Sequence, residues 1–297
     1  MASTHDYDND SRNNDIKIFI NGEFYLRSEA KISVMDSGYL LGDGVWEGIR
    51  FHKGHLVHLQ RHLDRLYEGA RAIEMTIGVS KDEMIVALKK TLEKNKMISD
   101  VHIRLIVSRG IKSTPYQHPK VTIGPPTIVI IPEYKKASPK LKVEGITLGT
   151  VKTIRDNRIQ DPRINSLSKH NCIAACIEAD NKGADEGLML DINGYVSTCN
   201  STNFFMIKDN EVLTSRGEYC LNGVTRGKVI EACRINGIPI HEVDFTVEDV
   251  HKADEAFVTG TFANIIPVKK INSTKFNLRN NHITIKLRNL YLELMER

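Results

Sequence analysis

The 297-residue sequence contains no apolar run that approaches the roughly 18 residues needed to cross a bilayer. It also lacks a long basic run. The net charge of +4 is spread along the chain, whereas a nucleic-acid surface needs basic residues concentrated on one face. These two absences argue against a membrane protein and against a nucleic-acid-binding protein. The polar, acidic first residues match neither a secretory signal nor an Arg-rich transit peptide.

Cysteines are few and show no metal-binding or disulfide pattern. There are five, an odd number, and no two are arranged as Cys-x-x-Cys. Cys172 and Cys176 are four residues apart in a helical pattern, which favours buried thiols over a metal site or a disulfide. The composition therefore predicts no metal and a reducing cytoplasm.

The hydrophobic content of 41% is enough for a real core, and the length suits one large domain or two modest ones. We expect an α+β chain in two parts, with a disordered tail over residues 1–14 and a small N-terminal α/β domain over 15–155. Residues 156–163 are polar and contain a proline, so they are expected to link this domain to a larger C-terminal domain over 164–297.

Turn signals and periodicity predict the main elements. Asn21-Gly22 predicts a hairpin that joins strands at Ile16–Ile20 and Glu23–Leu26. Apolar residues at helical spacing predict a helix over His58–Ile73. A helix capped by Ser166 or Ser168 is expected to run to Lys182, with Gly183 as its stop. Further strands are expected at Val101–Ser108, Pro126–Ile131, Gly187–Asp191, Tyr195–Cys199, Asn203–Lys208, Glu211–Thr214 and Glu255–Thr259, and a further helix near Gly227–Asn236.

Single motifs leave the chemistry open. Leu221–Arg226 places a glycine, a hydroxyl and a cation ahead of a helix, which suits either an anion cradle or an ordinary turn with a capping threonine. Gly260-Thr261 has the same ambiguity. Arg65, taken alone, is consistent with an ordinary solvated helix residue.

Together, these motifs follow a known order. The segment Val34–Arg50 reads VMDSGYLLGDGVWEGIR, and the chain from residue 17 to 297 resembles the class IV aminotransferases in one collinear series. The other matching segments are His62–Leu66, Arg104–Leu105, Ser108–Gly110, Asp161–Ile164, Gly183–Glu186, Leu190–Asp191, Asn193–Val196, Asn203–Phe205, Leu221–Arg226, Ala253–Glu255, Gly260–Thr261 and Pro267–Val268.

The resemblance implies the two-domain fold type IV shared by branched-chain and D-amino-acid aminotransferases, with pyridoxal 5'-phosphate near a homodimer interface. It also implies an amino-acid and a 2-oxo-acid substrate. Arg65, the backbone amides and hydroxyl of Val224 and Thr225, and Thr261 correspond to the residues that hold the cofactor phosphate, which suits a dianion.

Four further residues match substrate positions. Trp46 corresponds to an aromatic residue that lines the substrate pocket, and Tyr39 lies in the same segment. Phe262 corresponds to a residue whose backbone amide holds a substrate carboxylate. Arg104 corresponds to an arginine that meets a second carboxylate, although a strand arginine paired with a surface acid is an equally good interpretation.

The sequence departs from the family at the lysine that forms the Schiff base. Asn165 stands in its place, and Lys169 replaces a tyrosine that bonds the cofactor's 3-hydroxyl. Positions four apart share a helix face, so Lys169 is the expected Schiff-base lysine, with Asn165 beside the cofactor. The alternative is a solvent-exposed lysine at a helix start.

A second departure is Thr198, which replaces a glutamate that keeps the pyridine nitrogen protonated. A neutral hydroxyl weakens this electron sink. The favoured function is an aminotransferase acting on a small or hydrophobic, branched-chain-like amino acid. A lyase of the aminodeoxychorismate-lyase type, and a pseudoenzyme without the usual lysine and glutamate, remain alternatives.

Overall fold

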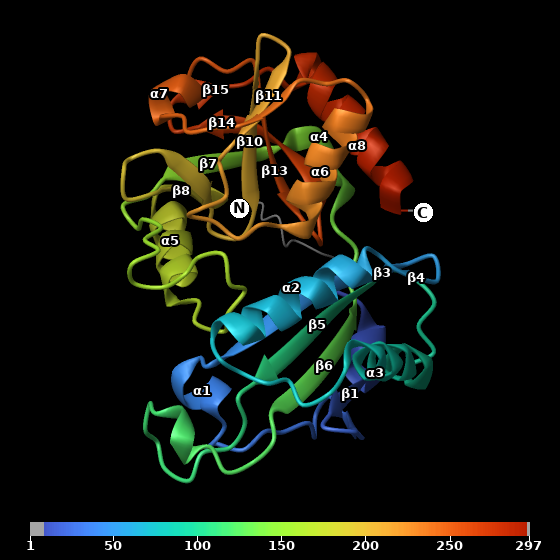
Figure 1. Ribbon diagram of the computed structural model, residues 1–297. Coiled ribbons are helices and arrows are strands. Elements are labelled where there is room, and N and C mark those ends of the chain that lie inside the picture. Colours follow the sequence, from blue (N-terminus) through green and yellow to red (C-terminus); the bar gives the residue numbers. More distant parts are fainter. Residues whose placement is uncertain (1–8, 296–297) are drawn as a thin grey trace. The chain divides into compact units, whose positions relative to one another are not determined.

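The computed structural model describes residues 9–295, and its contacts divide them into two compact units (Figure 1). We call residues 9–136 together with 164–169 the N-terminal unit, and residues 137–163 together with 170–295 the C-terminal unit. The mixture of helices and sheets confirms the expected α+β class. No helix in residues 9–295 is both long and apolar enough to cross a membrane.

The N-terminal unit contains a six-stranded antiparallel sheet in the order β2-β1-β6-β5-β3-β4. Its strands are β1 (Lys17–Ile20), β2 (Glu23–Leu26), β3 (Gly44–His52), β4 (His55–Leu56), β5 (Val101–Ser108) and β6 (Thr127–Tyr134). Its helices are α1 (Ser37–Leu41), α2 (Leu59–Ala72) and α3 (Lys81–Lys94), with short 3-10 turns at Ser11–Asp15 and Pro119–Val121.

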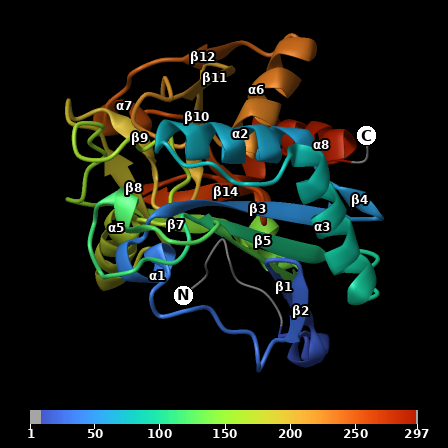
Figure 2. The same ribbon diagram turned by 60° about the horizontal axis from the view of Figure 1, so that its bottom comes forward.

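Helices α2 and α3 pack on this sheet, α2 against β3 and α3 against β1 and β6 (Figures 1 and 2). Leu63 and Leu66 of α2 are fully buried with Ile49, Ile103 and Leu105 in one apolar cluster. Burying an aliphatic side chain contributes about 1.5–3 kcal/mol, so this stripe fixes α2 on the sheet.

The C-terminal unit contains a nine-stranded mixed sheet in which β7 runs parallel to both β8 and β14. Its strands are β7 (Ile146–Thr150), β8 (Glu186–Leu190), β9 (Val196–Cys199), β10 (Asn203–Lys208), β11 (Glu211–Thr214), β12 (Ile240–Glu242), β13 (Glu255–Gly260), β14 (Asn264–Ile271) and β15 (Thr274–Lys275). Its helices are α4 (Pro139–Glu144), α5 (His170–Asn181), α6 (Val224–Ile235), α7 (Val247–Val250) and α8 (His282–Met295), with a 3-10 turn at Leu278–Asn280. Helices α6 and α8 pack together, and both contact β13.

Local signals predicted most elements correctly. Asn21 and Gly22 have positive φ angles of 47° and 101°, as a tight hairpin turn requires, and both hairpins with an Asn-Gly turn are present. Helix α2 and strands β5, β10, β11 and β13 also lie where they were expected. Gly183 has a φ of 68° just after α5, which confirms it as the stop signal.

Four expectations about the fold were wrong. Cys172 and Cys176 are not buried thiols, because Cys172 is half-buried and Cys176 is exposed on α5. The predicted boundary at residue 155 falls instead after residue 136, because β7 pairs with β8 and β14, and residues 164–169 belong to the N-terminal unit. Neither Ser166 nor Ser168 caps a helix, because α5 begins at His170. The tail predicted over residues 1–14 is ordered from residue 9, where Asn13 is buried and bonds the backbone of Tyr134. Residues 1–8 lie outside the described part.

Candidate active site

Residues 164–169 dock along β3 within the N-terminal unit through one isolated β-bridge and two backbone hydrogen bonds. Ser166 forms a β-bridge with Val45, the Trp46 amide donates to the Asn165 carbonyl at 3.0 Å, and the Leu167 amide donates to the Gly44 carbonyl at 2.9 Å. The indole Nε1 of Trp46 donates to the Ser166 carbonyl at 3.2 Å. The segment that carries the candidate amine is therefore anchored by backbone bonds to a buried strand.

The two residues that replace the family's lysine and tyrosine contact each other. Lys169 Nζ donates to Asn165 Oδ1 at 3.1 Å, and Asn165 Nδ2 donates to the Trp46 carbonyl at 2.7 Å. Asn165 is buried and Lys169 is half-buried. The helical argument for this pair was wrong, because both residues precede α5, but the extended segment still brings the Lys169 amine to the side chain of residue 165.

Two cationic groups lie over the indole ring of Trp46. Arg104 Cζ lies 3.7 Å from the indole centroid, and Lys169 Nζ lies 5.6 Å from it. Burial lowers the pKa of Arg104, although the charges of Glu133 and Glu47 oppose this effect. Within residues 9–295, Arg104 makes no ion pair, so the interpretation as a strand arginine paired with a surface acid is not supported.

Arg65 is held by a carboxylate that the sequence analysis did not single out. Glu47 on β3 is completely buried and accepts hydrogen bonds from Arg65 Nε and Nη2 and from His62 Nδ1, each at 2.7 Å. Burial would raise the pKa of Glu47, but the charge of Arg65 and the bonds from His62 and Arg65 lower it overall. An acidic residue within an apolar strand was the available signal, because a buried carboxylate needs a cationic partner.

Tyr39 is not brought to this cluster by any contact in the described chain. It lies on α1 and is 70% exposed. Its assignment to the substrate site stays a prediction.

In the C-terminal unit, Thr198 lies on β9 with its hydroxyl buried. Thr198 Oγ1 donates its proton to the Thr202 carbonyl at 2.8 Å, so in this arrangement the hydroxyl offers only an acceptor lone pair to another group. A protonated ring nitrogen can donate to that lone pair, but a neutral oxygen stabilises the proton less than a carboxylate does.

The turn before α6 presents hydrogen-bond donors suited to a phosphate. Gly223 is the N-cap and has no side-chain capping bond, and Val224 and Thr225 are the first helical residues. Their amides have no acceptor within the helix. Thr225 is buried, and its hydroxyl lies 3.4 Å from the hydroxyl of Tyr291. Arg226 points its charge elsewhere, toward Glu242 at 2.8 Å and the Ser215 carbonyl at 2.6 Å.

Thr261 and Phe262 follow β13 in the turn to β14. Thr261 is half-buried, whereas the Phe262 side chain is buried in the main apolar cluster of the C-terminal unit. The donor set of this unit, which consists of helix-start amides and two hydroxyls, fits the phosphate of pyridoxal phosphate. Because the Phe262 side chain is buried, only its backbone could face a substrate, and its assignment to the substrate site stays a prediction.

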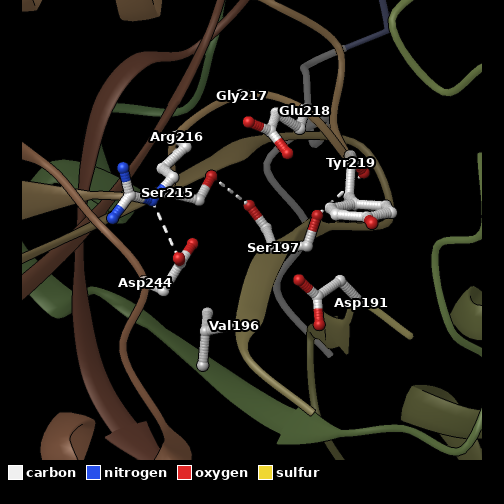
Figure 3. A pocket seen from close by; sticks show the side chains of 9 residues that line it. All are labelled: Asp191, Val196, Ser197, Ser215, Arg216, Gly217, Glu218, Tyr219 and Asp244. Atoms are coloured by element: carbon white, nitrogen blue, oxygen red, sulfur yellow. Dashed lines mark hydrogen bonds and ion pairs between the residues drawn. The ribbon is translucent and has the colours of Figure 1, made fainter. Parts of the chain in front are cut away.

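A small hollow in the C-terminal unit is lined by residues other than those assigned to the active site (Figure 3). Its polar groups bond one another: Ser215 Oγ donates to the Ser197 carbonyl at 2.7 Å, and Arg216 pairs with Asp244 at 2.8 Å. None of the residues expected at the active site lines it. No cluster of three or more potential metal ligands was found in residues 9–295.

Comparison with known proteins identifies the family of the chain. The fold is that of the fold-type IV pyridoxal-phosphate enzymes: the branched-chain aminotransferase of Thermoproteus uzoniensis, crystallised with norvaline, superimposes with a TM-score of 0.86 at 28% identity over 95% of each chain. The amino-transferase class IV family model matches residues 44–271, more than half of the sequence. The chain therefore belongs to the class IV aminotransferase family, whose cofactor is pyridoxal 5'-phosphate.

Two curated relatives cover almost the whole chain. A Methanocaldococcus jannaschii protein assigned as a branched-chain-amino-acid aminotransferase is 37% identical over 94% of this chain and 96% of its own. The D-alanine aminotransferase of Listeria monocytogenes serotype 4b is 31% identical over 94% and 96%. The relatives thus include proteins named for branched-chain amino acids and proteins named for D-alanine.

Proposed function

We propose that this chain is an aminotransferase that moves an amino group from a small or hydrophobic, branched-chain-like amino acid to a 2-oxo acid, with Lys169 as its reactive amine. One observation carries the proposal: Lys169 Nζ lies 3.1 Å from the side chain of residue 165, where the family has its lysine. A different backbone position thus delivers an amine to the same neighbourhood.

When bound, pyridoxal phosphate supplies an aldehyde that condenses with amines and a ring that withdraws electrons from them. In this proposal, Lys169 provides the amine that links the cofactor to the protein. Its Nζ would accept the proton that leaves the α-carbon of the amino acid and deliver that proton to the cofactor. Asn165 and Trp46, which contact Lys169, define where that proton is held.

Arg65, Val224, Thr225 and Thr261 would hold the phosphate. Glu47 fixes the guanidinium of Arg65 in one orientation, and α6 contributes the amides at its start. Binding of the dianion by one guanidinium and several N–H donors agrees with the chemistry of each group.

Thr198 distinguishes this chain from a standard member of the family. Because its hydroxyl is a neutral acceptor, the ring nitrogen would be protonated less firmly than beside a glutamate. Together with Asn165, this residue also favours a second candidate, a pseudoenzyme that binds the cofactor without turning over.

Trp46, Arg104 and the Phe262 backbone would contact the substrate, and Tyr39 is assigned there by resemblance alone. The indole narrows the pocket, which suits a small or branched side chain. Arg104 is stacked but not ion-paired, so it can bind the second carboxylate of an acidic 2-oxo acid.

We also propose that the chain forms a homodimer and works in a reducing cytoplasm. Helix α5 exposes Ile173 and Ile177, which are 53% and 57% accessible, on one helical face together with Cys176, and an apolar stripe of this kind suits an interface. The five cysteines are free thiols.

Borohydride reduction in the presence of pyridoxal phosphate, followed by peptide mass mapping, tests the role of Lys169. Amine and aldehyde condense with loss of water, borohydride delivers a hydride to the carbon, and solvent supplies the proton. The pyridoxyl mass is expected on Lys169. A mass on Lys152, Lys182 or another lysine refutes the assignment, and no labelled lysine at all favours the pseudoenzyme.

A further inference from the structure

Asn165 does more than occupy the place of a missing lysine. Its side chain is buried, with 5% of its surface accessible, and both ends of the amide are bonded. The Trp46 carbonyl can only accept, so the NH₂ end must face it and the oxygen must face Lys169. The orientation of the amide is therefore determined by the strand to which it is bonded.

Docking of the segment does not depend on the Asn165 side chain alone. Backbone bonds join Trp46 to Asn165 and Leu167 to Gly44, and Ser168 Oγ donates to the Gly42 carbonyl at 3.1 Å. The Asn165 amide adds a contact that these bonds do not provide, because it bonds the amine of Lys169.

A lysine side chain has four rotatable bonds and loses about 2 kcal/mol of rotamer free energy when it is fixed. An acceptor aimed at Nζ favours one of its many positions. An aspartate could do the same, but its charge would stabilise the ammonium form, which is not nucleophilic. A neutral amide oxygen orients the amine without supplying a counter-charge. Arg104, on β5, contacts the same indole as Lys169 and also adds no negative charge.

We propose that Asn165 is the positioning residue for the Lys169 amine: its amide, oriented by the Trp46 carbonyl, holds Nζ in place without adding a charge. This inference rests on the proposed role of Lys169. At position 165, where the family carries the reactive amine, this chain would carry the residue that positions that amine.

The test compares Asn165→Asp and Asn165→Leu with Ser168→Ala as the matched control. Ser168→Ala removes the bond to the Gly42 carbonyl, which docks the same segment, and leaves the Asn165 amide in place. Two readouts are used. One is the pH titration of Lys169 after reductive ¹³C-methylation, followed by NMR on protein without cofactor. The other is the rate at which borohydride and pyridoxal phosphate label Lys169.

Asn165→Asp is expected to raise the pKa of the Lys169 amine by about one unit or more, because an opposite charge in contact favours the ammonium form. Labelling of Lys169 at neutral pH should then be about tenfold slower. Asn165→Leu is expected to slow labelling roughly two- to tenfold, the range for one lost neutral hydrogen bond, without that rise in the titration. Ser168→Ala should leave both readouts at the parent values.

The inference is overturned if Asn165→Asp does not move the titration, or if Asn165→Leu and Ser168→Ala slow labelling equally. Thermal unfolding of each variant separates loss of fold from loss of position. If the parent label lies on another lysine, the proposed function fails. The cofactor-free titration still reports whether Asn165 governs the Lys169 amine.

Discussion

Nε and Nη2 of Arg65 each lie 2.7 Å from a different oxygen of the Glu47 carboxylate, in a bidentate pair between α2 and β3. His62 adds a third bond to the same buried carboxylate. The residue assigned to the cofactor phosphate is therefore oriented by the core of its own unit, which links cofactor binding to the stability of that core.

Arg65→Ala should weaken the affinity for pyridoxal phosphate about ten- to a hundredfold, because one charge-assisted contact contributes about 1.5–3 kcal/mol. Equilibrium titration measures the dissociation constant. Pyridoxal, which lacks the phosphate, is the matched ligand and should bind parent and variant alike. An unchanged constant for the phosphorylated ligand would remove Arg65 from the site.

Glu47→Gln should lower the free energy of unfolding by about 1.5–3 kcal/mol at pH 7, since it removes the charge that strengthens the hydrogen bonds from the partly buried Arg65. The pKa of Glu47 is lowered in the folded state, so its stabilisation is present above its ordinary pKa of 4.5 and is lost as the pH falls through the lowered value. Urea unfolding between pH 7 and pH 3 should therefore show that the free energy of unfolding falls less with decreasing pH in the variant than in the parent. Glu68→Gln, on the exposed side of α2, should match the parent.

Lys169→Ala should abolish pyridoxyl labelling at that position, while the cofactor still docks through its phosphate. Adding Asn165→Lys to this variant should create a labelled lysine at position 165, because the two side chains reach the same place. Mass mapping of the reduced protein measures both outcomes. Lys182→Ala, which removes a lysine bonded to the Thr150 carbonyl, should label like the parent.

Thr198→Glu should raise the pH at which the absorbance of the bound cofactor changes, because a carboxylate holds a proton on the ring nitrogen more firmly than a hydroxyl does. Thr198→Val removes the acceptor and should move the transition the other way. Spectra recorded across pH measure both shifts. Three identical curves, with cofactor bound throughout, would place Thr198 away from the ring.

Gly223→Ala should destabilise the protein by about 1–3 kcal/mol, because the new Cβ would lie 2.2 Å from Asn203 Oδ1. Asn203 cannot retreat freely, since it is buried and donates to the Leu221 carbonyl at 2.8 Å. Gly227→Ala, inside the helix that Gly223 caps, meets no atom within 4 Å and should stabilise the protein by about 0.5–1 kcal/mol. Thermal and urea unfolding of both variants check the contrast.

Local chemistry accounts for what could be predicted from the sequence. The Asn21-Gly22 hairpin and the stripe on α2 depend on neighbouring residues, and both were predicted correctly. The start of α5 was missed because Ser168 bonds the Gly42 carbonyl, far away in sequence, instead of capping a helix. The domain boundary was missed for the same reason, since β7 pairs with strands that follow it by many residues.

In the candidate site, too, local sequence patterns could be interpreted, whereas contacts between distant segments could not be predicted. Motif order assigned Arg65 and Thr225 to the cofactor phosphate, and a departure from the motif pointed to Lys169; these assignments stay predictions. The contact between Lys169 and Asn165 was argued from a helix that does not include them. Glu47 was missed because its importance depends on α2 covering β3, which periodicity does not specify.

The docking of residues 164–169 on Val45 has a consequence for synthesis. Residues 9–136 emerge from the ribosome first, yet the Val45 stretch of β3 has no bonding partner from residues 164–169 until those residues have also left the exit tunnel. During that interval an unpaired strand edge is open to other nascent chains. A ribosome that pauses before codon 164 would prolong this exposure. Synonymous changes in that stretch of the gene should therefore alter the yield of folded protein without altering the protein itself.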